Sequence, residues 1–247
     1  MYNPFSLEGK TILITGASSG IGEAAAIQCS KLGGKIILTA RNKERLEKTF
    51  SQLVGEEHEF YIADLTIEDE IGQLIKKLPP LDGVVHSAGI GGTKPVKFLK
   101  KEFIDKIFFI NYQAPVLLSQ KLVAGKILKK ESSIVFISSI AADDHSLGNS
   151  IYGSSKGAVT SFAKYLAKEL VTQKIRVNSI LPGTINTPLS SSKTISDEQW
   201  TLNEKEYPLG GFGVPEDIAY LIIYLLSNAS KWMTGNKIRI DGGYSLS

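Results

Sequence analysis

Short runs of β-branched and other apolar residues alternate with longer stretches of helical periodicity along the whole chain. Several short runs are almost continuously apolar (TILIT, KIILT, SIVFI), which is typical of strands covered on both faces. The expected strands are Thr11–Thr15, Lys35–Thr39, Glu59–Ala63, Gly83–His86, Ser133–Ile137, Arg176–Ile180 and Lys237–Ile240. The expected helices include Ile21–Leu32, Lys43–Leu53, Ile67–Lys77, Phe103–Ile127, Tyr152–Val171 and Pro215–Leu226.

This alternation predicts an α/β protein with a doubly wound, mostly parallel sheet of seven strands and helices on both faces. Neither a repeat nor a linker divides the 247 residues, so we expect a single domain over residues 1–247. One long stretch, Thr184–Gly213, shows no periodicity, is rich in serine and carries Trp200 and Tyr207. We predict that it is an irregular loop that closes over a substrate.

Composition narrows the class of protein. The 28 basic and 25 acidic side chains leave a net charge of +3, which gives no reason to expect nucleic acid as a partner. The longest apolar stretch, near Ile218–Leu226, is shorter than the roughly 20 residues that span a bilayer. Cys29 is the only cysteine, so neither an intrachain disulfide nor a cysteine-rich metal site is expected. Met1–Lys10 lacks a signal-peptide pattern, and we expect a soluble, cytoplasmic protein without a metal.

A glycine-rich turn, Thr15-Gly16-Ala17-Ser18-Ser19-Gly20-Ile21-Gly22, joins the first expected strand to the first expected helix. Gly16 allows a tight turn, Gly20 lets the backbone approach a pyrophosphate, and Gly22 lets the helix pack closely on the sheet. The N–H groups at the start of that helix can bind phosphate. We predict a dinucleotide site that includes Gly16, Ser18, Ser19, Gly20, Ile21 and Gly22, with an ordinary structural turn as the alternative.

The end of the second expected strand indicates which dinucleotide is bound. The sequence there is Thr39-Ala40-Arg41-Asn42, without the carboxylate that binds the ribose 2′-hydroxyl of NAD. The guanidinium of Arg41 can instead pair with a 2′-phosphate, which favours NADP(H), with NAD(H) as the alternative. The alternative for Arg41 itself is a solvated side chain before a helix that Asn42 caps.

The spacing T-G-x-x-x-G-x-G resembles the signature of the short-chain dehydrogenase/reductase family, and similarities extend over essentially the whole chain. The resemblance implies a Rossmann fold with a nicotinamide cofactor. It implies that Asp64-Leu65 contacts adenine, although Asp64 also suits a helix cap, and that Ala88-Gly89 passes close to the cofactor. His86-Ser87 replaces two asparagines of the family, and we predict that His86 is a structural residue at a strand end rather than a base.

Tyr152 and Lys156 form the most specific pair in the chain. If a helix begins at Tyr152, Lys156 lies one turn further along the same face. A free phenol has a pKa of about 10, and a neighbouring ammonium together with an oxidised nicotinamide lowers this pKa by favouring phenolate. Tyr152 can then give a proton to a carbonyl oxygen or take one from an alcohol. The resemblance implies that Lys156 also binds the nicotinamide ribose.

The resemblance completes the site with residues from other segments. Ser139, the second serine after the fifth expected strand, matches the family's catalytic serine and would bind the substrate oxygen. Asn111 lies in an otherwise apolar helix and matches the fourth catalytic position, with a helix irregularity ahead of a proline as its alternative. After the sixth expected strand, Pro182-Gly183 would shape a turn, and Ile185 and Thr187 would approach the nicotinamide carboxamide.

The set implies an NADP(H)-dependent oxidoreductase that reduces a carbonyl or oxidises a secondary alcohol, similar to 3-oxoacyl-(acyl-carrier-protein) reductases. One alternative is an NAD-linked dehydrogenase of a sugar, polyol or steroid-type alcohol. Another is a cofactor-sensing module without turnover. Loss of Tyr152, Lys156 or Ser139 would be expected in such a module, and all three are present.

The expected partner is a small-molecule substrate, free or bound to an acidic carrier protein. The lysines of segment Lys126–Lys130 would meet such a carrier, and a solvated helix end explains them as well. The acidic pair Asp143-Asp144 and the neighbouring His145 either line the entrance to the substrate pocket or are ordinary surface-loop residues. The resemblance also implies a homotetramer or a homodimer.

Overall fold

The computed structural model describes residues 2–190 and 197–246. Within them, seven strands form one parallel sheet in the order β3-β2-β1-β4-β5-β6-β7. The strand order reverses between β1 and β4, which opens a crevice at the carboxyl ends of these strands. The strands are β1 (Thr11–Thr15), β2 (Lys35–Ala40), β3 (Glu59–Ile62), β4 (Leu81–His86), β5 (Leu128–Ile137), β6 (Arg176–Pro182) and β7 (Lys237–Ile240). All seven predicted strands are confirmed, and the sheet is parallel throughout.

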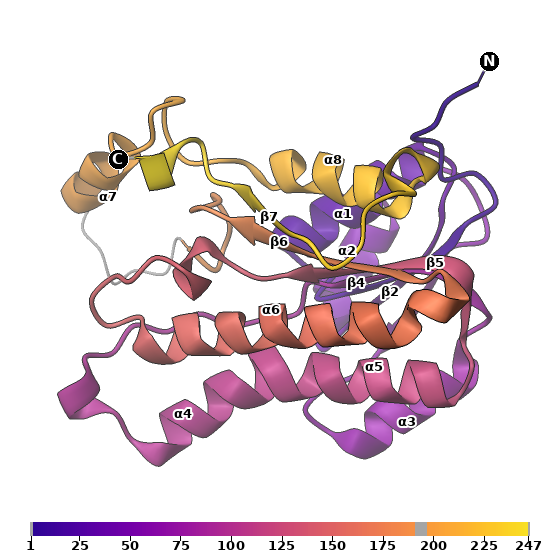
Figure 1. Cartoon of the computed structure of the whole chain (residues 1–247), viewed down its shortest axis with the longest axis horizontal. Coiled ribbons are helices and arrows are strands. Elements are labelled where there is room, and N and C mark those ends of the chain that lie inside the picture. The colour runs from indigo at the N-terminus through magenta and orange to yellow at the C-terminus, as the bar shows by residue number, and fades with distance from the viewer. Residues whose placement is uncertain (1, 191–196, 247) are drawn as a thin grey trace.

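Helices cover both faces of the sheet (Figure 1). They are α1 (Gly20–Lys31), α2 (Lys43–Phe50), α3 (Glu68–Lys77), α4 (Lys101–Phe108), α5 (Ala114–Ala124), α6 (Ser150–Leu170), α7 (Asp197–Glu204) and α8 (Pro215–Leu226). Helices α1, α2 and α8 lie on one face, and α3, α4, α5 and α6 lie on the other. This is the doubly wound Rossmann arrangement that the sequence predicts.

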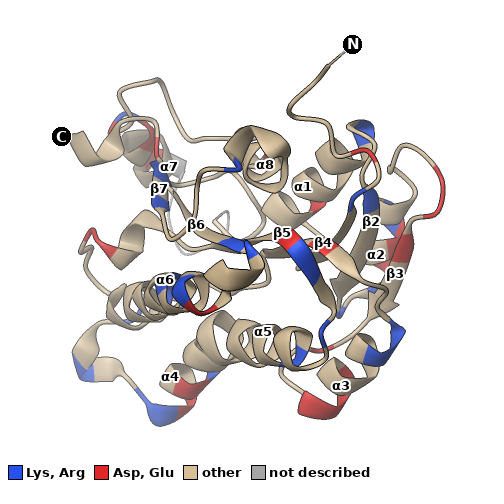
Figure 2. Cartoon of the chain, turned by 45° about the vertical axis from the view of Figure 1, so that its right-hand side comes forward, with Lys and Arg blue, Asp and Glu red and all other residues tan. Residues whose placement is uncertain are grey.

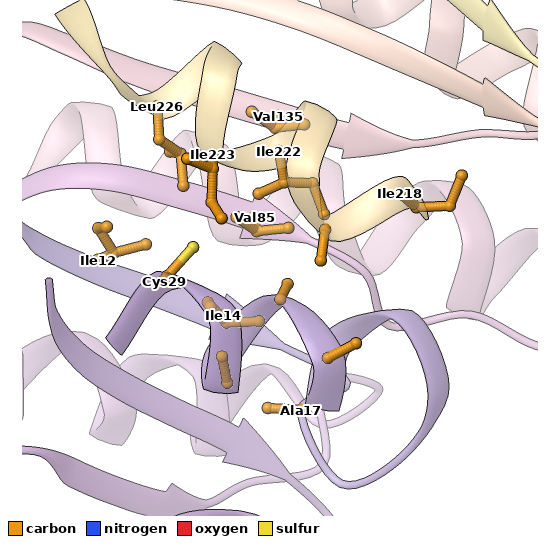
Figure 3. Packing of buried hydrophobic residues seen from close by; sticks show 14 of the residues in the cluster. Ile12, Ile14, Ala17, Cys29, Val85, Val135, Ile218, Ile222, Ile223 and Leu226 are labelled. Atoms are coloured by element: carbon orange, nitrogen blue, oxygen red, sulfur yellow. The ribbon is translucent and has the colours of Figure 1, made fainter. Parts of the chain in front are cut away.

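Successive residues of the central strands point to opposite faces, which divides the core in two. Ile12 and Ile14 of β1 are buried on the side of α1 and α8, whereas Leu13 between them is buried on the side of α3, α5 and α6. Figure 3 shows Cys29 of α1 within the first of these clusters, beside strand residues such as Val85 and the apolar face of α8. Burial raises the pKa of the Cys29 thiol to about 12, so this cysteine is a packed apolar side chain.

The single helix predicted over Phe103–Ile127 is wrong in two respects. Helix α4 passes through a π-helical segment, Phe109–Gln113, into α5, which ends at Ala124. Pro115 has no N–H to donate to the carbonyl four residues earlier, so the regular hydrogen-bond pattern is broken at Asn111. The chain leaves the helix through Lys126, whose φ is 54°.

The prediction of an irregular loop over Thr184–Gly213 is also wrong in part. The segment contains helix α7, and residues 191–196 of it lie outside the described residues. The ring centroid of Trp200, in α7, lies 4.7 Å from that of Phe212. This tertiary contact stabilises a short helix whose sequence, DEQWTLNE, shows no apolar stripe.

Charged residues are distributed over many elements of the fold. In the view of Figure 2, blue Lys and Arg segments and red Asp and Glu segments of the ribbon are interspersed. Among the described residues, no helix is both long and apolar enough to cross a bilayer. That part of the chain also holds no group of three or more His, Cys, Asp or Glu side chains that could bind a metal ion.

Candidate active site

The glycine-rich turn lies at the carboxyl end of β1, against the turn that follows β4. Gly16 and Gly20 have φ angles of 65° and 57°, where glycine is favoured. A Cβ at Gly16 would lie 2.7 Å from the Cα of Ala88, and a Cβ at Gly22 would lie 2.4 Å from the carbonyl oxygen of Gly16. The hydroxyl of Thr15 accepts a hydrogen bond of 3.2 Å from the Ala88 N–H. The two turns can approach this closely only because position 16 is glycine, and Gly22 lets α1 begin directly against the Gly16 carbonyl.

A cavity of about 610 Å³ follows this turn and passes the ends of β2, β3 and β4. Its volume is typical of sites that bind small molecules and cofactors. The side chain of Ser19, the N-cap of α1, makes no capping hydrogen bond, so backbone N–H groups of the first turn remain available to an anion. Predicted site residues that line the cavity are Gly16, Ser18, Ser19, Gly20, Ile21, Arg41, Asp64, Leu65, Ala88, Gly89 and Thr187.

Arg41 and Asp64 face each other across one end of the cavity, with Nη1 of Arg41 3.6 Å from Oδ2 of Asp64. The Arg41 side chain is 60% exposed, so it can turn toward a ligand. Burial raises the pKa of Asp64, but hydrogen bonds from Thr66 and the Arg41 charge outweigh it, and the net pKa is lowered. The N-cap of α3 is Ile67 rather than Asp64, so the helix-cap interpretation of Asp64 is wrong.

His86 is enclosed at the end of β4. Its ring stacks on Phe136 with 4.5 Å between centroids, and its Nε2 shares a hydrogen bond of 3.1 Å with the Ser119 hydroxyl. Burial lowers the pKa of His86 to about 3. His86 is therefore a neutral structural residue at neutral pH.

Three segments meet at Gly89. A Cβ there would lie 3.2 Å from Oδ1 of Asn111 and 3.3 Å from Nζ of Lys156. Oδ1 of Asn111 accepts a hydrogen bond of 2.9 Å from the Ile90 N–H, and Nδ2 donates one of 3.0 Å to the Ile90 carbonyl. Nδ2 also donates to the Ser155 hydroxyl at 3.1 Å. The π-helical segment thus brings Asn111 to the start of α6.

The two serines after β5 have different environments. The Ser138 hydroxyl donates a hydrogen bond of 2.9 Å to the carbonyl of Lys156 and so ties β5 to α6. The Ser139 hydroxyl accepts one of 3.1 Å from the Ala141 N–H and is also hydrogen-bonded to the Tyr152 side chain. Ser139 is therefore the serine that faces the candidate catalytic tyrosine.

Tyr152 and Lys156 lie in the first two turns of α6, which begins at Ser150. Nζ of Lys156 lies 5.8 Å from the centroid of the Tyr152 ring and donates a hydrogen bond of 2.9 Å to the Ile137 carbonyl. Burial lowers the pKa of Lys156 to about 8. Burial also raises the pKa of Tyr152, against the opposing effect of the hydrogen bond with Ser139. The protein groups by themselves therefore do not lower the phenol pKa as the sequence analysis expects.

The segment after β6 approaches the cavity with only some of its predicted residues. Pro182 ends β6, and the Gly183 N–H donates a hydrogen bond of 2.9 Å to the Ile240 carbonyl. Ile185 is only 7% exposed and packs in the core beside α8. Thr187 lines the cavity and its methyl group meets the glycine-rich turn. Thr187 is thus placed to touch a ligand, whereas Pro182, Gly183 and Ile185 support the loop from behind.

The cavity is also lined by residues that the sequence analysis did not single out. Asn42 caps α2 as expected, because its Oδ1 accepts a hydrogen bond of 2.9 Å from the Arg45 N–H. Arg45 itself lines the cavity together with Leu189. The spacing of four residues between Arg41 and Arg45 is a signal that could have identified the second arginine. No local pattern marks Leu189.

An aromatic cluster anchors the base of the expected lid. The Tyr207 hydroxyl donates a hydrogen bond of 2.8 Å to the Thr184 hydroxyl and accepts one of 2.9 Å from the Thr184 N–H. The Tyr207 ring lies 5.2 Å from that of Phe212 and 5.0 Å from that of Tyr244. These contacts join the loop after β6 to the C-terminal part of the chain.

Three comparisons with known proteins identify the family of the chain. A family model described as Enoyl-(Acyl carrier protein) reductase matches residues 16–245. The 3-oxoacyl-[acyl-carrier-protein] reductase FabG of Rickettsia prowazekii is 34% identical over 237 residues, 96% of this chain and 97% of that protein. The crystal structure of a dehydrogenase/reductase from Sinorhizobium meliloti 1021 matches with a TM-score of 0.90 at 31% identity, covering 98% of this chain and 97% of the other. That of a putative gluconate dehydrogenase from Agrobacterium tumefaciens matches with a TM-score of 0.92 at 25% identity, covering 98% of each chain.

Fold and site define an oxidoreductase of the doubly wound α/β class. The family model and the identity to full-length relatives show more narrowly that the chain belongs to the short-chain dehydrogenase/reductase family. It is an oxidoreductase that acts on carbonyl or alcohol groups. The resemblance found in the sequence motifs is confirmed.

Proposed function

We propose that the protein is an NADP(H)-dependent carbonyl reductase, which in the opposite direction oxidises a secondary alcohol. The observation that carries this proposal is the arrangement of three side chains, Ser139 after β5 and Tyr152 and Lys156 at the start of α6. Ser139 is hydrogen-bonded to the Tyr152 side chain, and Nζ of Lys156 lies 5.8 Å from the Tyr152 ring. A proton donor, a hydroxyl that can bind the same substrate oxygen and a nearby cation are what carbonyl reduction requires.

The cavity fits a dinucleotide, because Gly16, Gly20 and Gly89 line it at positions where a Cβ would lie 2.7–3.2 Å from a neighbouring segment. In this proposal Ser18, Ser19 and the first N–H groups of α1 bind the pyrophosphate, and Arg41 binds a 2′-phosphate. Lys156 binds the nicotinamide ribose, and Thr187 contacts the carboxamide. The remaining contacts assigned to the cofactor are those of Gly16, Gly20, Ile21, Asp64, Leu65, Ala88, Gly89 and Tyr152, while Gly22, Pro182, Gly183 and Ile185 act indirectly by shaping the turns that border the site. The cofactor supplies the hydride.

The chain's own residues hold the substrate oxygen and move its proton. Ser139 donates a hydrogen bond to the carbonyl oxygen, and Tyr152 transfers its phenolic proton to that oxygen as reduction proceeds. The Lys156 charge stabilises the phenolate that results. Asn111 holds a water through which Lys156 exchanges protons with solvent. In the oxidative direction the phenolate takes the proton of the alcohol.

The substrate class follows from the relatives. The name of the Rickettsia prowazekii protein supports a 3-oxoacyl thioester, free or bound to an acidic carrier protein. The putative gluconate dehydrogenase supports the alternative of a sugar-type alcohol as the substrate. Within the segment Lys126–Lys130, Lys129 forms an ion pair of 2.7 Å with Asp82, which reduces the positive charge that the segment offers to a carrier.

A substrate panel tests the proposal. The purified protein is mixed with 3-oxoacyl thioesters, simple ketones and sugar alcohols, each with both nicotinamide cofactors, and nicotinamide absorbance is followed. We expect thioester reduction with NADPH, with kcat/KM about tenfold or more above that with NADH. Turnover restricted to sugar alcohols with NAD would overturn the assignment in favour of the alternative, and no turnover of any substrate would reject the reductase. The Tyr152→Phe variant gives the background rate of the absorbance change.

We also propose that the protein is a homotetramer or a homodimer. Trp232 is 97% exposed and Tyr165 69% exposed, and strand β7 is an edge of the sheet. Large exposed aromatic side chains and an open strand edge favour association. Sedimentation as a monomer at micromolar concentration would contradict this proposal.

A further inference from the structure

A cluster of ion pairs joins the segment after Ser139 to the edge strand of the sheet. Oδ1 and Oδ2 of Asp143 accept hydrogen bonds of 2.8 and 2.6 Å from Nζ of Lys237. Oδ2 also accepts one of 3.4 Å from Nη2 of Arg239, and Nη1 of Arg239 lies 3.7 Å from Oδ2 of Asp144. We call Asp143, Asp144, Lys237 and Arg239 the charge cluster. Basic residues of β7 are visible in blue in Figure 2.

A short, rigid turn separates the charge cluster from the active site. The 3₁₀ turn Ile140–Ala142 is all that lies between Ser139 and Asp143. The N–H groups of Asp143 and Asp144 both donate hydrogen bonds of 2.8 Å to the Ile140 carbonyl, and the Ala141 N–H donates to the Ser139 hydroxyl. Displacement of Asp143 is therefore transmitted to Ser139 through a hydrogen-bonded turn rather than through a loose loop.

The other side of this turn rests on α6. A Cβ at Gly153 would lie 2.3 Å from the carbonyl oxygen of Ala141, so the backbones of the turn and the helix are in direct contact. Gly153 follows Tyr152 directly. The turn is thus held between the helix that carries Tyr152 and the strand that carries Lys237.

The charge cluster is balanced and partly shielded from solvent. The side chains of Asp143 and Lys237 are 29% and 42% exposed. The hydrogen bond from Lys237 is the largest cause that lowers the pKa of Asp143, so its carboxylate stays ionised at neutral pH. An isolated exposed ion pair contributes little to stability, whereas a network that engages both oxygens of one carboxylate has a defined geometry. Such a network is suited to holding a segment of the backbone in a fixed position.

We propose that Asp143 is a positioning residue that, through Lys237 and Arg239, holds the turn where the Ser139 hydroxyl meets the Tyr152 side chain. The inference rests on the proposed function, because Ser139 and Tyr152 act together on the substrate oxygen there. The cofactor cavity is lined by other residues. Loosening the turn therefore lowers kcat with little change in the KM for the cofactor, since small misplacements of reacting groups can cost about 100-fold in rate.

Charge reversal tests the proposal. Asp143→Lys and Lys237→Asp each place like charges together, and we expect each to lower kcat by about tenfold. The double variant Asp143→Lys/Lys237→Asp restores the pair in reverse, and Arg239 keeps Asp144. We expect it to recover kcat to within about threefold of the wild type. Glu131 and Lys174 form a matched control pair, with 3.1 Å between Oε1 and Nζ at the other end of β5. The same reversal there leaves kcat unchanged.

Two further readouts separate positioning from loss of stability, using the mild variant Asp143→Asn. The groups that face the phenol, Ser139 and Lys156, are both retained in it. A weaker hydrogen bond from Ser139 raises the pH midpoint of kcat for alcohol oxidation by about half a unit. Amide exchange at Ala141 and Asp143 becomes faster in Asp143→Asn and stays unchanged in Glu131→Gln. A purely structural role lowers the melting temperature without moving the pH midpoint.

The outcomes distinguish the two proposals. If the wild type reduces no substrate, the proposed function fails, and amide exchange alone decides whether Asp143 holds the turn. Faster exchange in Asp143→Asn than in the control supports the inference, and equal exchange overturns it. If the wild type is active, normal kcat in both single reversals overturns it. Absence of recovery in the double variant does the same.

Discussion

Nζ of Lys156 donates a hydrogen bond of 2.9 Å to the carbonyl oxygen of Ile137, the last residue of β5. This contact places an amine of α6 at the carboxyl edge of the sheet, where it is only 6% exposed. Burial lowers the pKa of Lys156 to about 8, because removing an ammonium from water costs free energy. The enzyme therefore keeps a destabilising charge beside Tyr152 at neutral pH.

Lys156→Met is expected to abolish turnover and to stabilise the protein at pH 7 by about 1–2 kcal/mol, after allowance for the hydrogen bond lost at Ile137. Below pH 8 the amine is charged in both states, so the full burial cost is present. Between pH 8 and about 10.4 the unfolded chain binds the proton that the folded chain has lost, so wild-type stability rises with pH. Urea unfolding at pH 7 and pH 10 measures the difference, which should shrink at pH 10. Lys164→Met, on the exposed face of the same helix, should show no such trend.

Tyr152→Phe is expected to lower kcat by roughly 10²–10⁴, because it removes the group that exchanges a proton with the substrate oxygen. Cofactor affinity should change by less than about threefold, since the ring and Lys156 remain. Single-turnover kinetics and fluorescence titration with NADPH measure the two quantities. Ser154→Ala, two residues further along the helix and exposed, is the control. Residual activity close to that of the control would assign the proton transfer to another group.

Arg41→Ala is expected to weaken NADPH binding by about 10–100-fold, because a charge-assisted hydrogen bond to the 2′-phosphate is lost. Binding of NADH should change by less than about threefold. Calorimetric titration with each cofactor tests this, with Lys43→Ala as the control, because Lys43 pairs with Glu47 and does not line the cavity. Equal wild-type affinities for NADPH and NADH would remove Arg41 from cofactor selection.

Gly153→Ala is expected to destabilise the protein by about 1–3 kcal/mol and to lower kcat, since the new Cβ would lie 2.3 Å from the Ala141 carbonyl oxygen. Gly72 lies in α3 with nothing within 4 Å of the corresponding Cβ position. Gly72→Ala should therefore stabilise by about 0.5–1 kcal/mol, through helix propensity, with normal activity. Chemical denaturation and kcat measure both. A neutral Gly153→Ala variant would show that the turn can move away from α6.

His86 gives the protein a predictable sensitivity to acid. Its folded pKa is about 3, against about 6.5 in the unfolded chain, so the unfolded chain binds the extra proton between these values. Stability therefore falls as pH decreases through this range, by about 3 kcal/mol at pH 4 from this residue. Urea midpoints from pH 7 to pH 4 should fall less steeply for His86→Gln than for the wild type. Parallel curves would mean that His86 takes up its proton without unfolding.

The features that the sequence predicts correctly arise between residues close together along the chain, and the features that it misses arise from contacts between distant segments. The seven strands and the glycine-rich turn are local patterns, and Tyr152 and Lys156 meet because a helix places residues four apart on one face. For the break in the helix at Asn111, the sequence showed only a proline inside an apolar helix, and not the π-helical segment itself. The two hydrogen bonds that the Asn111 side-chain amide forms with the Ile90 backbone depend on the packing of two distant segments.

The amino-acid sequence by itself therefore determined the doubly wound sheet, the position of the glycine-rich turn and the pairing of Tyr152 with Lys156, because each arises from spacing within one or two elements. Only the tertiary structure decided that Ile185 packs in the core and that Asp143 meets Lys237. These contacts join residues far apart along the chain, at positions set by the packing of whole elements. The local periodicity of a sequence does not predict such contacts.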